Sequence, residues 1–163
     1  MNYDEFYSNK KKNMSTIRLQ TIRKDDMLLD SNLYSEFQLM KATTFSDLKI
    51  WQEAAGFTSE IMKSSEVFGN ELIQSLLSES CIQMVSKISE GFGQGSAQSF
   101  LDQLYVAKGL LTKIQSLLLI SENFPEASKD LVAMYLKRSE DLKEELVKYI
   151  SNLVKKGEKA LAS

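Results

Sequence analysis

The fold is decided by the stretch Ile88-Ser89-Glu90-Gly91-Phe92-Gly93-Gln94-Gly95-Ser96, which leads into an apolar segment between Phe100 and Gly109. Its three alternate glycines allow positive φ angles and close backbone approach, so the chain can reverse its direction there. The serine that follows is placed to cap a new helix. We therefore predict a helix, a structural hinge and a second helix, with the hinge formed by Glu90, Gly91, Gly93, Gly95 and Ser96.

Helical spacing continues on both sides of this hinge. The 163 residues include one proline and seven glycines, and so few helix breakers favour long helices. Apolar residues at intervals of three and four predict a helix that begins near Phe45-Ser46-Asp47 with Ser46 as its cap, and further helices over about 69–90 and 96–123. A fourth helix should hold Pro125 in its first turn and end near Gly157.

Four helices joined by short turns predict an all-α fold, an antiparallel up-down-up-down four-helix bundle with an N-terminal extension. The apolar stripes do not keep a strict heptad, which favours a globular bundle over a coiled coil. We expect the extension over residues 1–44, the bundle over 45–157 and a C-terminal tail over 158–163.

The N-terminal extension differs in composition from the remainder of the chain. Residues 33–40 place Leu33, Tyr34, Phe37 and Met40 at helical spacing, which predicts a short amphipathic helix over about 27–41. Residues 9–24 hold no acidic residue but six basic ones: Lys10, Lys11, Lys12, Arg18, Arg23 and Lys24. Two interpretations remain open, a mobile tail that reflects an upstream start codon and an arm that contacts RNA, DNA or a partner protein.

Three lysines near or beyond the hinge, Lys87, Lys108 and Lys113, lie in otherwise apolar helix faces. They either extend to solvent or form a small basic patch that faces nucleic-acid phosphates or a neighbouring subunit. Glu90 ends a helix, where a negative charge is unfavourable, so we expect it to accept hydrogen bonds from hinge amides or to pair with a lysine such as Lys108.

Several functional classes are excluded or disfavoured by composition. The chain has no histidine, which excludes histidine-dependent triads and ordinary zinc sites. The glycine-rich stretch follows a predicted helix, whereas a dinucleotide loop follows a strand. Carboxylates such as Glu140, Glu144 and Glu145 are typical of a solvated helix face, so an enzyme with paired carboxylates is disfavoured. We expect no enzymatic activity, no catalytic residue, no metal and no cofactor.

The cellular setting is indicated by three features. Cys81 is the single cysteine, which fits a core position and a reducing cytoplasm. The start of the chain lacks the apolar segment of a signal peptide, and the most apolar stretch, at 117–120, is short for a membrane span. Trp51, Tyr105 and Phe92 fit either core positions or anchors at an interface.

The chain resembles the small four-helix bundle proteins encoded in intervening sequences of bacterial 23S ribosomal RNA genes. Their relative is the accessory variability determinant of diversity-generating retroelements. The resemblance covers roughly 45–157 and lies in the stretch Phe45-Ser46-Asp47-Leu48-Lys49-Ile50-Trp51-Gln52-Glu53-Ala54, the hinge, and Phe100-Leu101 with Leu104-Tyr105-Val106-Ala107-Lys108-Gly109. It implies a four-helix bundle, a pentameric assembly, and a non-enzymatic accessory role that binds nucleic acid and a reverse transcriptase.

Two departures from that family make the bundle surface a weaker candidate for binding nucleic acid. The arginine typical after the second hinge glycine is Gln94, and an arginine pair in the preceding helix is replaced by Glu79 and Ser80. Residues 46–163 hold 13 basic and 16 acidic residues, a net charge of −3. The basic arm at 10–24 is therefore the better candidate for binding RNA or DNA, and a purely protein-binding bundle that lacks nucleic-acid affinity is the alternative.

Overall fold

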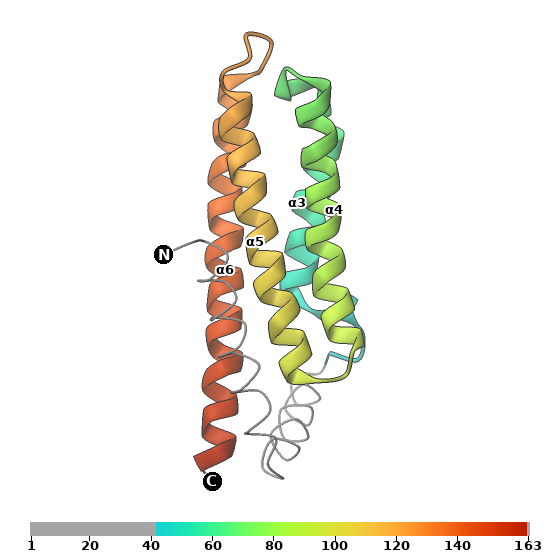
Figure 1. Cartoon of the computed structure of the whole chain (residues 1–163), viewed down its shortest axis with the longest axis vertical. Coiled ribbons are helices and arrows are strands. Elements are labelled where there is room, and N and C mark those ends of the chain that lie inside the picture. The colour runs from blue at the N-terminus through green and yellow to red at the C-terminus, as the bar shows by residue number, and fades with distance from the viewer. Residues whose placement is uncertain (1–41, 163) are drawn as a thin grey trace, which may run out of the picture.

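The computed structural model describes residues 42–162 of the chain, as an all-α bundle. A single 3₁₀ turn, η1 (Phe45–Asp47), precedes α3 (Lys49–Lys63), and a second, η2 (Ser65–Phe68), precedes α4 (Glu71–Gly93). The chain then continues through α5 (Ala97–Ser121) and α6 (Lys129–Ala162). The helices α3, α4, α5 and α6 alternate in direction, and each packs against its neighbour in sequence while α6 closes back on α3 (Figure 1). The predicted antiparallel four-helix bundle is confirmed.

The core is built from the inner faces of the four helices. In α5 the buried positions are Ala97, Phe100, Leu104, Ala107, Leu111, Ile114, Leu117, Leu118 and Ser121, which are spaced by three and four residues apart from the adjacent pair at 117 and 118. The additional buried position at 117 departs from a strict heptad, as expected for a globular bundle. The largest fully buried side chains are Phe57, Phe68, Phe100, Ile61, Leu77, Met84, Ile88, Leu104, Leu111, Ile114, Leu118 and Leu146.

The hinge reverses the chain at one glycine. Gly95 has a φ of +68°, in the left-handed region that favours glycine, whereas Gly91 and Gly93 lie within the last turn of α4. Gly91 serves close approach, because a Cβ there would lie 2.7 Å from the Cβ of Gln103 on α5. Ser96 caps α5 as predicted, since its Oγ accepts a hydrogen bond from the Ser99 amide at 3.3 Å.

The other helix boundaries differ from the sequence expectations. Ser46 does not cap α3, whose N-cap residue Leu48 makes no side-chain cap hydrogen bond. Asp47 instead closes the preceding turn η1, because its carboxylate accepts hydrogen bonds from the Thr43 and Thr44 amides, both at 2.9 Å. These bonds, the one from the Thr44 amide first, lower the pKa of Asp47. At the start of α4, Asn70 accepts from the amides of Leu72 and Ile73.

The fourth helix also starts and ends later than expected. Pro125 lies in the turn between α5 and α6, and α6 begins only at Lys129. The helix passes through Gly157 and reaches Ala162, so the expected stop at Gly157 is wrong. A single glycine costs only about 1 kcal/mol of helix propensity, which an otherwise helix-favouring segment absorbs.

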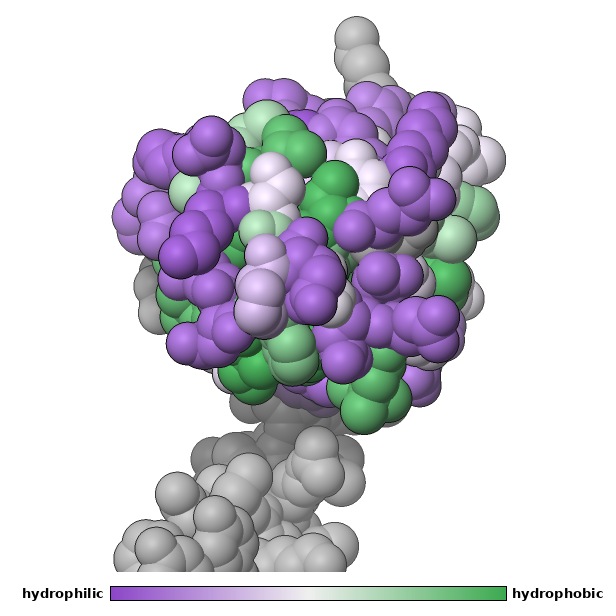
Figure 2. All heavy atoms as spheres, turned by 90° about the horizontal axis from the view of Figure 1, so that it is seen from above, coloured by the Kyte–Doolittle hydropathy of each residue, from purple (hydrophilic) through white to green (hydrophobic). Residues whose placement is uncertain are grey.

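The two ends of the bundle differ. One end carries the α3–α4 and α5–α6 connections, and Figure 2 shows it covered largely by hydrophilic residues with apolar residues between them. The other, which we call the hinge end, carries the start of α3, the hinge and the last turns of α6 (Figure 1). At the hinge end α6 projects past the hinge.

Candidate interaction surface

The three lysines singled out from the sequence do not form one patch. Lys87 lies on α4, and its Nζ pairs with Glu90 Oε2 at 2.6 Å. Lys108 and Lys113 lie five residues apart on α5, which places them about 140° apart around the helix. The Lys108 ammonium lies 5.2 Å from the centre of the Tyr105 ring, and Lys113 is exposed. Their binding of nucleic acid stays a prediction.

The hinge forms a compact structural unit. Glu90 pairs with Lys87 on its own helix, so the lysine partner is Lys87 and not the expected Lys108. Phe92 packs edge-on against Phe100 with ring centroids 6.2 Å apart. The hinge glycines thus join two helices and do not follow a strand. The basic residues Lys10, Lys11, Lys12, Arg18, Arg23 and Lys24, and the amphipathic helix predicted over 27–41, lie outside the described residues.

The most unusual surface is the outward side of α5. Among its 25 residues only Asp102, Lys108 and Lys113 are charged. Two of its large apolar residues, Tyr105 and Leu119, are 49% and 53% exposed. We call the exposed positions of this helix the α5 outer face: Gln98, Asp102, Tyr105, Val106, Gly109, Thr112, Lys113, Ser116, Leu119 and Ile120. The sequence left Tyr105 open as a core residue or an interface anchor, and it did not show which other residues of this helix stay in solvent.

By length and composition, α5 is also the one helix in the described part of the chain that could cross a membrane. The apolar segment is thus longer than the 117–120 stretch considered from the sequence. Its most apolar window is 39% buried within the bundle, and the core helix of a soluble protein meets the same criterion. The inner face of α5 packs against α4 and α6, which accounts for much of its apolar character.

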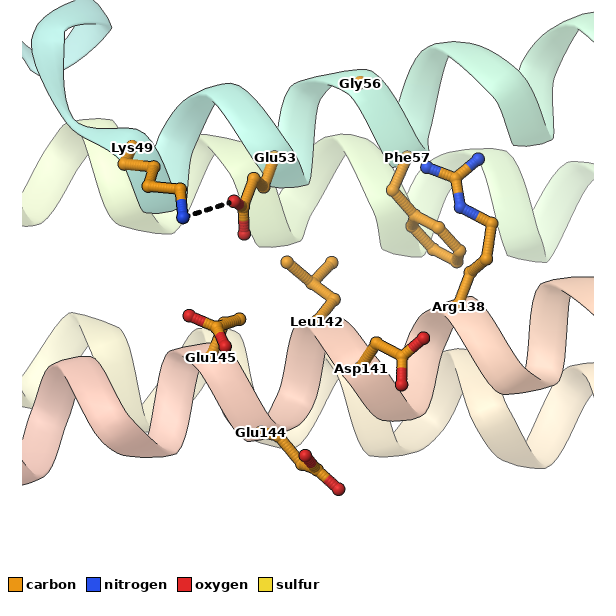
Figure 3. Close-up of a pocket in the computed structure, with 9 residues that line it drawn as sticks. All are labelled: Lys49, Glu53, Gly56, Phe57, Arg138, Asp141, Leu142, Glu144 and Glu145. Carbon is orange, nitrogen blue, oxygen red and sulfur yellow. Dashed lines mark ion pairs between the residues drawn. The ribbon is translucent and has the colours of Figure 1, made fainter.

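A shallow cleft of about 530 Å³ lies between α3 and α6 (Figure 3). Phe57 and Leu142 point into it from opposite helices, and acidic side chains surround them. Each of four carboxylates at or beside the cleft has a cationic partner: Glu53 pairs with Lys49 at 3.3 Å, Asp141 with Lys137 at 2.8 Å, Glu145 with Lys148 at 2.9 Å, and Glu60 with Arg138.

This cleft does not resemble an acid–base site. A general acid needs a carboxyl whose pKa is raised toward neutrality. The hydrogen bond from Lys148 instead lowers the pKa of Glu145. Within residues 42–162 no group of three acidic or cysteine side chains is placed to hold a metal ion.

A second groove, of about 730 Å³, runs between α5 and α6. Leu119, Leu136 and Val147 supply its apolar lining. Lys143 bridges the two helices by donating a hydrogen bond to Gln115 Oε1 at 3.1 Å. The groove adjoins the α5 outer face through Leu119, so it extends the weakly charged surface toward α6.

The sequence did not decide whether three aromatic residues lie in the core or at an interface, and the structure places them differently. Tyr105 is exposed, whereas Trp51 and Phe92 are half-buried and pack against the core. Cys81 is fully buried, and burial raises the pKa of its thiol to about 12. The core position predicted for Cys81 is confirmed.

Comparison with known protein families, with curated proteins and with solved structures finds no match for this chain.

Proposed function

We propose that this protein is a non-enzymatic scaffold that assembles with copies of itself through the α5 outer face and binds nucleic acid through its basic arm. The observation that carries the proposal is the exposure of this face together with its low charge. Exposed faces of helices in monomeric proteins are usually rich in charged residues. A helix that turns Tyr105, Val106, Leu119 and Ile120 to solvent is typical of an interaction site.

The chemistry of the α5 outer face favours contact with another protein surface. Tyr105 offers a large ring with a polar tip, a residue type enriched in interfaces. One helical turn later, Gly109 has no atom within 4 Å of the position a Cβ would take, so a neighbouring backbone can approach closely there. Few charged groups would lose their hydration when the face is covered. These features support association between folded bundles.

The resemblance to the accessory proteins of diversity-generating retroelements adds the expected stoichiometry and partners. It favours a pentamer, a reverse transcriptase as protein partner, and RNA or DNA as ligand. For the bundle itself, the dispersed lysines and the net charge of −3 over residues 46–163 argue against a broad phosphate-binding surface. The basic arm remains the part of the chain best suited to that role.

Self-association is tested by light scattering on the full chain. The double variant Tyr105→Glu/Ile120→Glu should dissociate the assembly into monomers, because it places two charges in the α5 outer face. A matched control, Ala133→Glu/Ser151→Glu, adds the same charge at exposed positions of α6 and should leave the assembly intact. A wild-type chain that is monomeric at high micromolar concentration would refute the scaffold.

Nucleic-acid binding is tested by fluorescence anisotropy with RNA and DNA over a salt series. Replacing the six basic residues of the arm by glutamine should abolish binding, and wild-type affinity should fall steeply with salt, with a logarithmic slope of up to about −5 on duplex DNA. The triple variant Lys87→Gln/Lys108→Gln/Lys113→Gln should change little. If the triple variant loses binding and the arm variant keeps it, the site lies on the bundle instead.

A second candidate is a purely protein-binding bundle. The acidic excess of the bundle favours it, because phosphate backbones are repelled by such a surface. An assembly that forms normally but binds neither RNA nor DNA at low salt would support this alternative.

A further inference from the structure

The hinge end of the bundle leaves buried polar atoms without partners. Among the described side chains, Trp51 Nε1, Gln103 Oε1 and the Tyr149 hydroxyl are buried and make no hydrogen bond. All three belong to this end: Trp51 lies in the first turn of α3, Gln103 lies against Gly91 of the hinge, and Tyr149 packs edge-on against Phe100 with centroids 6.2 Å apart. Buried polar groups are nearly always satisfied in native proteins, so three such atoms at one end set the hinge end apart from the rest of the described bundle.

Apolar side chains are also left in solvent at the hinge end. Phe45 is 41% exposed and packs edge-on against Trp51 with centroids 5.1 Å apart. Leu153 is the last buried residue among the positions of α6 whose burial is described, which end at 156, and Val154 is 36% exposed. The helix continues for nine residues beyond Leu153, about 13 Å, to Ala162, and projects past the hinge (Figure 1).

The chain enters the bundle at this same end. Ala42 packs against the core, and the following 3₁₀ turn η1 contacts both α3 and α4. The residues that precede Ala42 are therefore tethered at the hinge end. The sequence over 27–41 predicts an amphipathic helix, which at 15 residues would be about 22 Å long. A tethered segment has a high effective concentration at a nearby surface, so modest contacts suffice to hold it.

The segment and the end of α6 carry net charges of opposite sign. Residues 27–41 contain Asp30, Glu36 and Lys41, a net charge of −1. The described end of α6 carries Lys155 and Lys156, which are exposed and half-buried respectively. Their charges lie near a helix C-terminus, where a second, acidic segment would add favourable interactions.

We propose that residues 27–41 of the same chain dock as an amphipathic helix on the hinge end. Leu33, Tyr34, Phe37 and Met40 cover Phe45, Trp51 and Val154, and Asp30 and Glu36 face Lys155 and Lys156. The basic arm at 10–24 directly precedes this segment, so docking would hold the arm beside the hinge and restrict the directions from which nucleic acid reaches it.

Trp51 offers a direct test because it is the only tryptophan of the chain and lies on the proposed surface. In the full-length protein, the variant Leu33→Asp/Phe37→Asp should shift the Trp51 emission to the red and increase its quenching by acrylamide. The matched variant Ser31→Asp/Ser35→Asp adds the same charge on the opposite side of the predicted helix and should leave both signals unchanged. If the two variants behave alike, the proposal is overturned.

Hydrogen exchange read by mass spectrometry provides an independent measurement. Amides of residues 27–41 should exchange at least about tenfold more slowly than those of residues 1–24, and Leu33→Asp/Phe37→Asp should remove the difference. Val154→Asp should remove it as well, whereas Ser151→Asp, at an exposed position nearby, should preserve it. Equal exchange rates over the two segments of the wild type would refute docking.

Dilution identifies the chain that supplies the segment. Docking within one chain gives protection that is constant over a hundredfold range of concentration. Protection that disappears on dilution would show that residues 27–41 cover a second copy and would overturn the assignment to the same chain. The association tested with Tyr105→Glu/Ile120→Glu concerns a different surface, so either proposal can fail without the other.

Discussion

The neighbouring helices α5 and α6 pack against each other yet present opposite surfaces to solvent. Of the 25 residues of α5 three are charged, whereas α6 has 14 charged residues among 34. Both contribute fully buried side chains to one core. The inner faces of both helices therefore account for the fold. Their outer faces differ, because that of α6 is suited to water and that of α5 to a partner.

The largest expected effect tests whether the buried faces of α5 and α6 contribute equally to the stability of the core. Leu111 on α5 and Leu146 on α6 are at most 1% exposed. Leu111→Ala and Leu146→Ala should each lower the free energy of unfolding by about 2–5 kcal/mol, because each leaves a cavity in the same core. Urea denaturation measures both. If one variant loses stability within this range and the other falls outside it, α5 and α6 contribute unequally to the core.

Glycine substitutions separate the inner contacts of α5 from its outer face. Gly91→Ala should destabilise the bundle by about 1–3 kcal/mol, since the new Cβ would meet Gln103 Cβ at 2.7 Å. Gly109→Ala should stabilise the bundle by about 0.4–1 kcal/mol, because the site is helical and open. Thermal unfolding compares them, under conditions in which the chain is monomeric. A destabilising Gly109→Ala in the monomer would contradict the open site.

A smaller effect concerns the start of α5. Ser96→Ala removes the acceptor for the Ser99 amide and should cost about 1 kcal/mol. Ser96→Asp keeps an acceptor at the helix N-terminus and should restore stability. The free energy of unfolding of both variants is measured in urea. Equal losses in both variants would mean that Ser96 acts through packing instead of capping.

The smallest effect is the pH dependence of the charged surface of α6. The hydrogen bond from Lys148 lowers the pKa of Glu145 below 4.5, so its contribution is present above that pH and is lost as pH falls through the folded-state pKa. Glu145 and Asp141, respectively, raise the pKa values of Lys148 and Lys137 above 10.5, so their contributions persist below that pH and are lost above it.

These surface pairs therefore stabilise the fold between roughly pH 4.5 and 10.5. Glu145→Gln should flatten the acid side of a plot of melting temperature against pH, and Lys137→Met the alkaline side. The changes should be small and should shrink further in high salt, because the pairs are exposed. Substituting Thr112 of α5 by valine is the control, since no charge is involved. If Glu145→Gln leaves the acid side of this plot unchanged, the pair of Glu145 and Lys148 is not the cause of the stability lost at low pH.

The sequence alone was sufficient for the helical class, the number of helices in the bundle, the reversal between α4 and α5 and the Ser96 cap. These features depend on residues close in the chain, namely apolar spacing, glycine at a positive φ and a side chain that reaches its own helix start. Cys81 was likewise expected in the core because a free cysteine behaves as a small hydrophobic residue. Local chemistry and tertiary packing agree at these positions.

Only the tertiary structure decided which surface of each helix stays in solvent. Lys87, Lys108 and Lys113 separate because helix rotation and packing orient them, and Gly91 is required because Gln103 lies opposite it on the next helix. Asp47, and not Ser46, closes the turn η1 before the first α-helix, because the backbone amides of residues 43 and 44 fold back onto its carboxylate. Spacing in a sequence records distances along the chain, whereas exposure and contact depend on how the helices pack against one another.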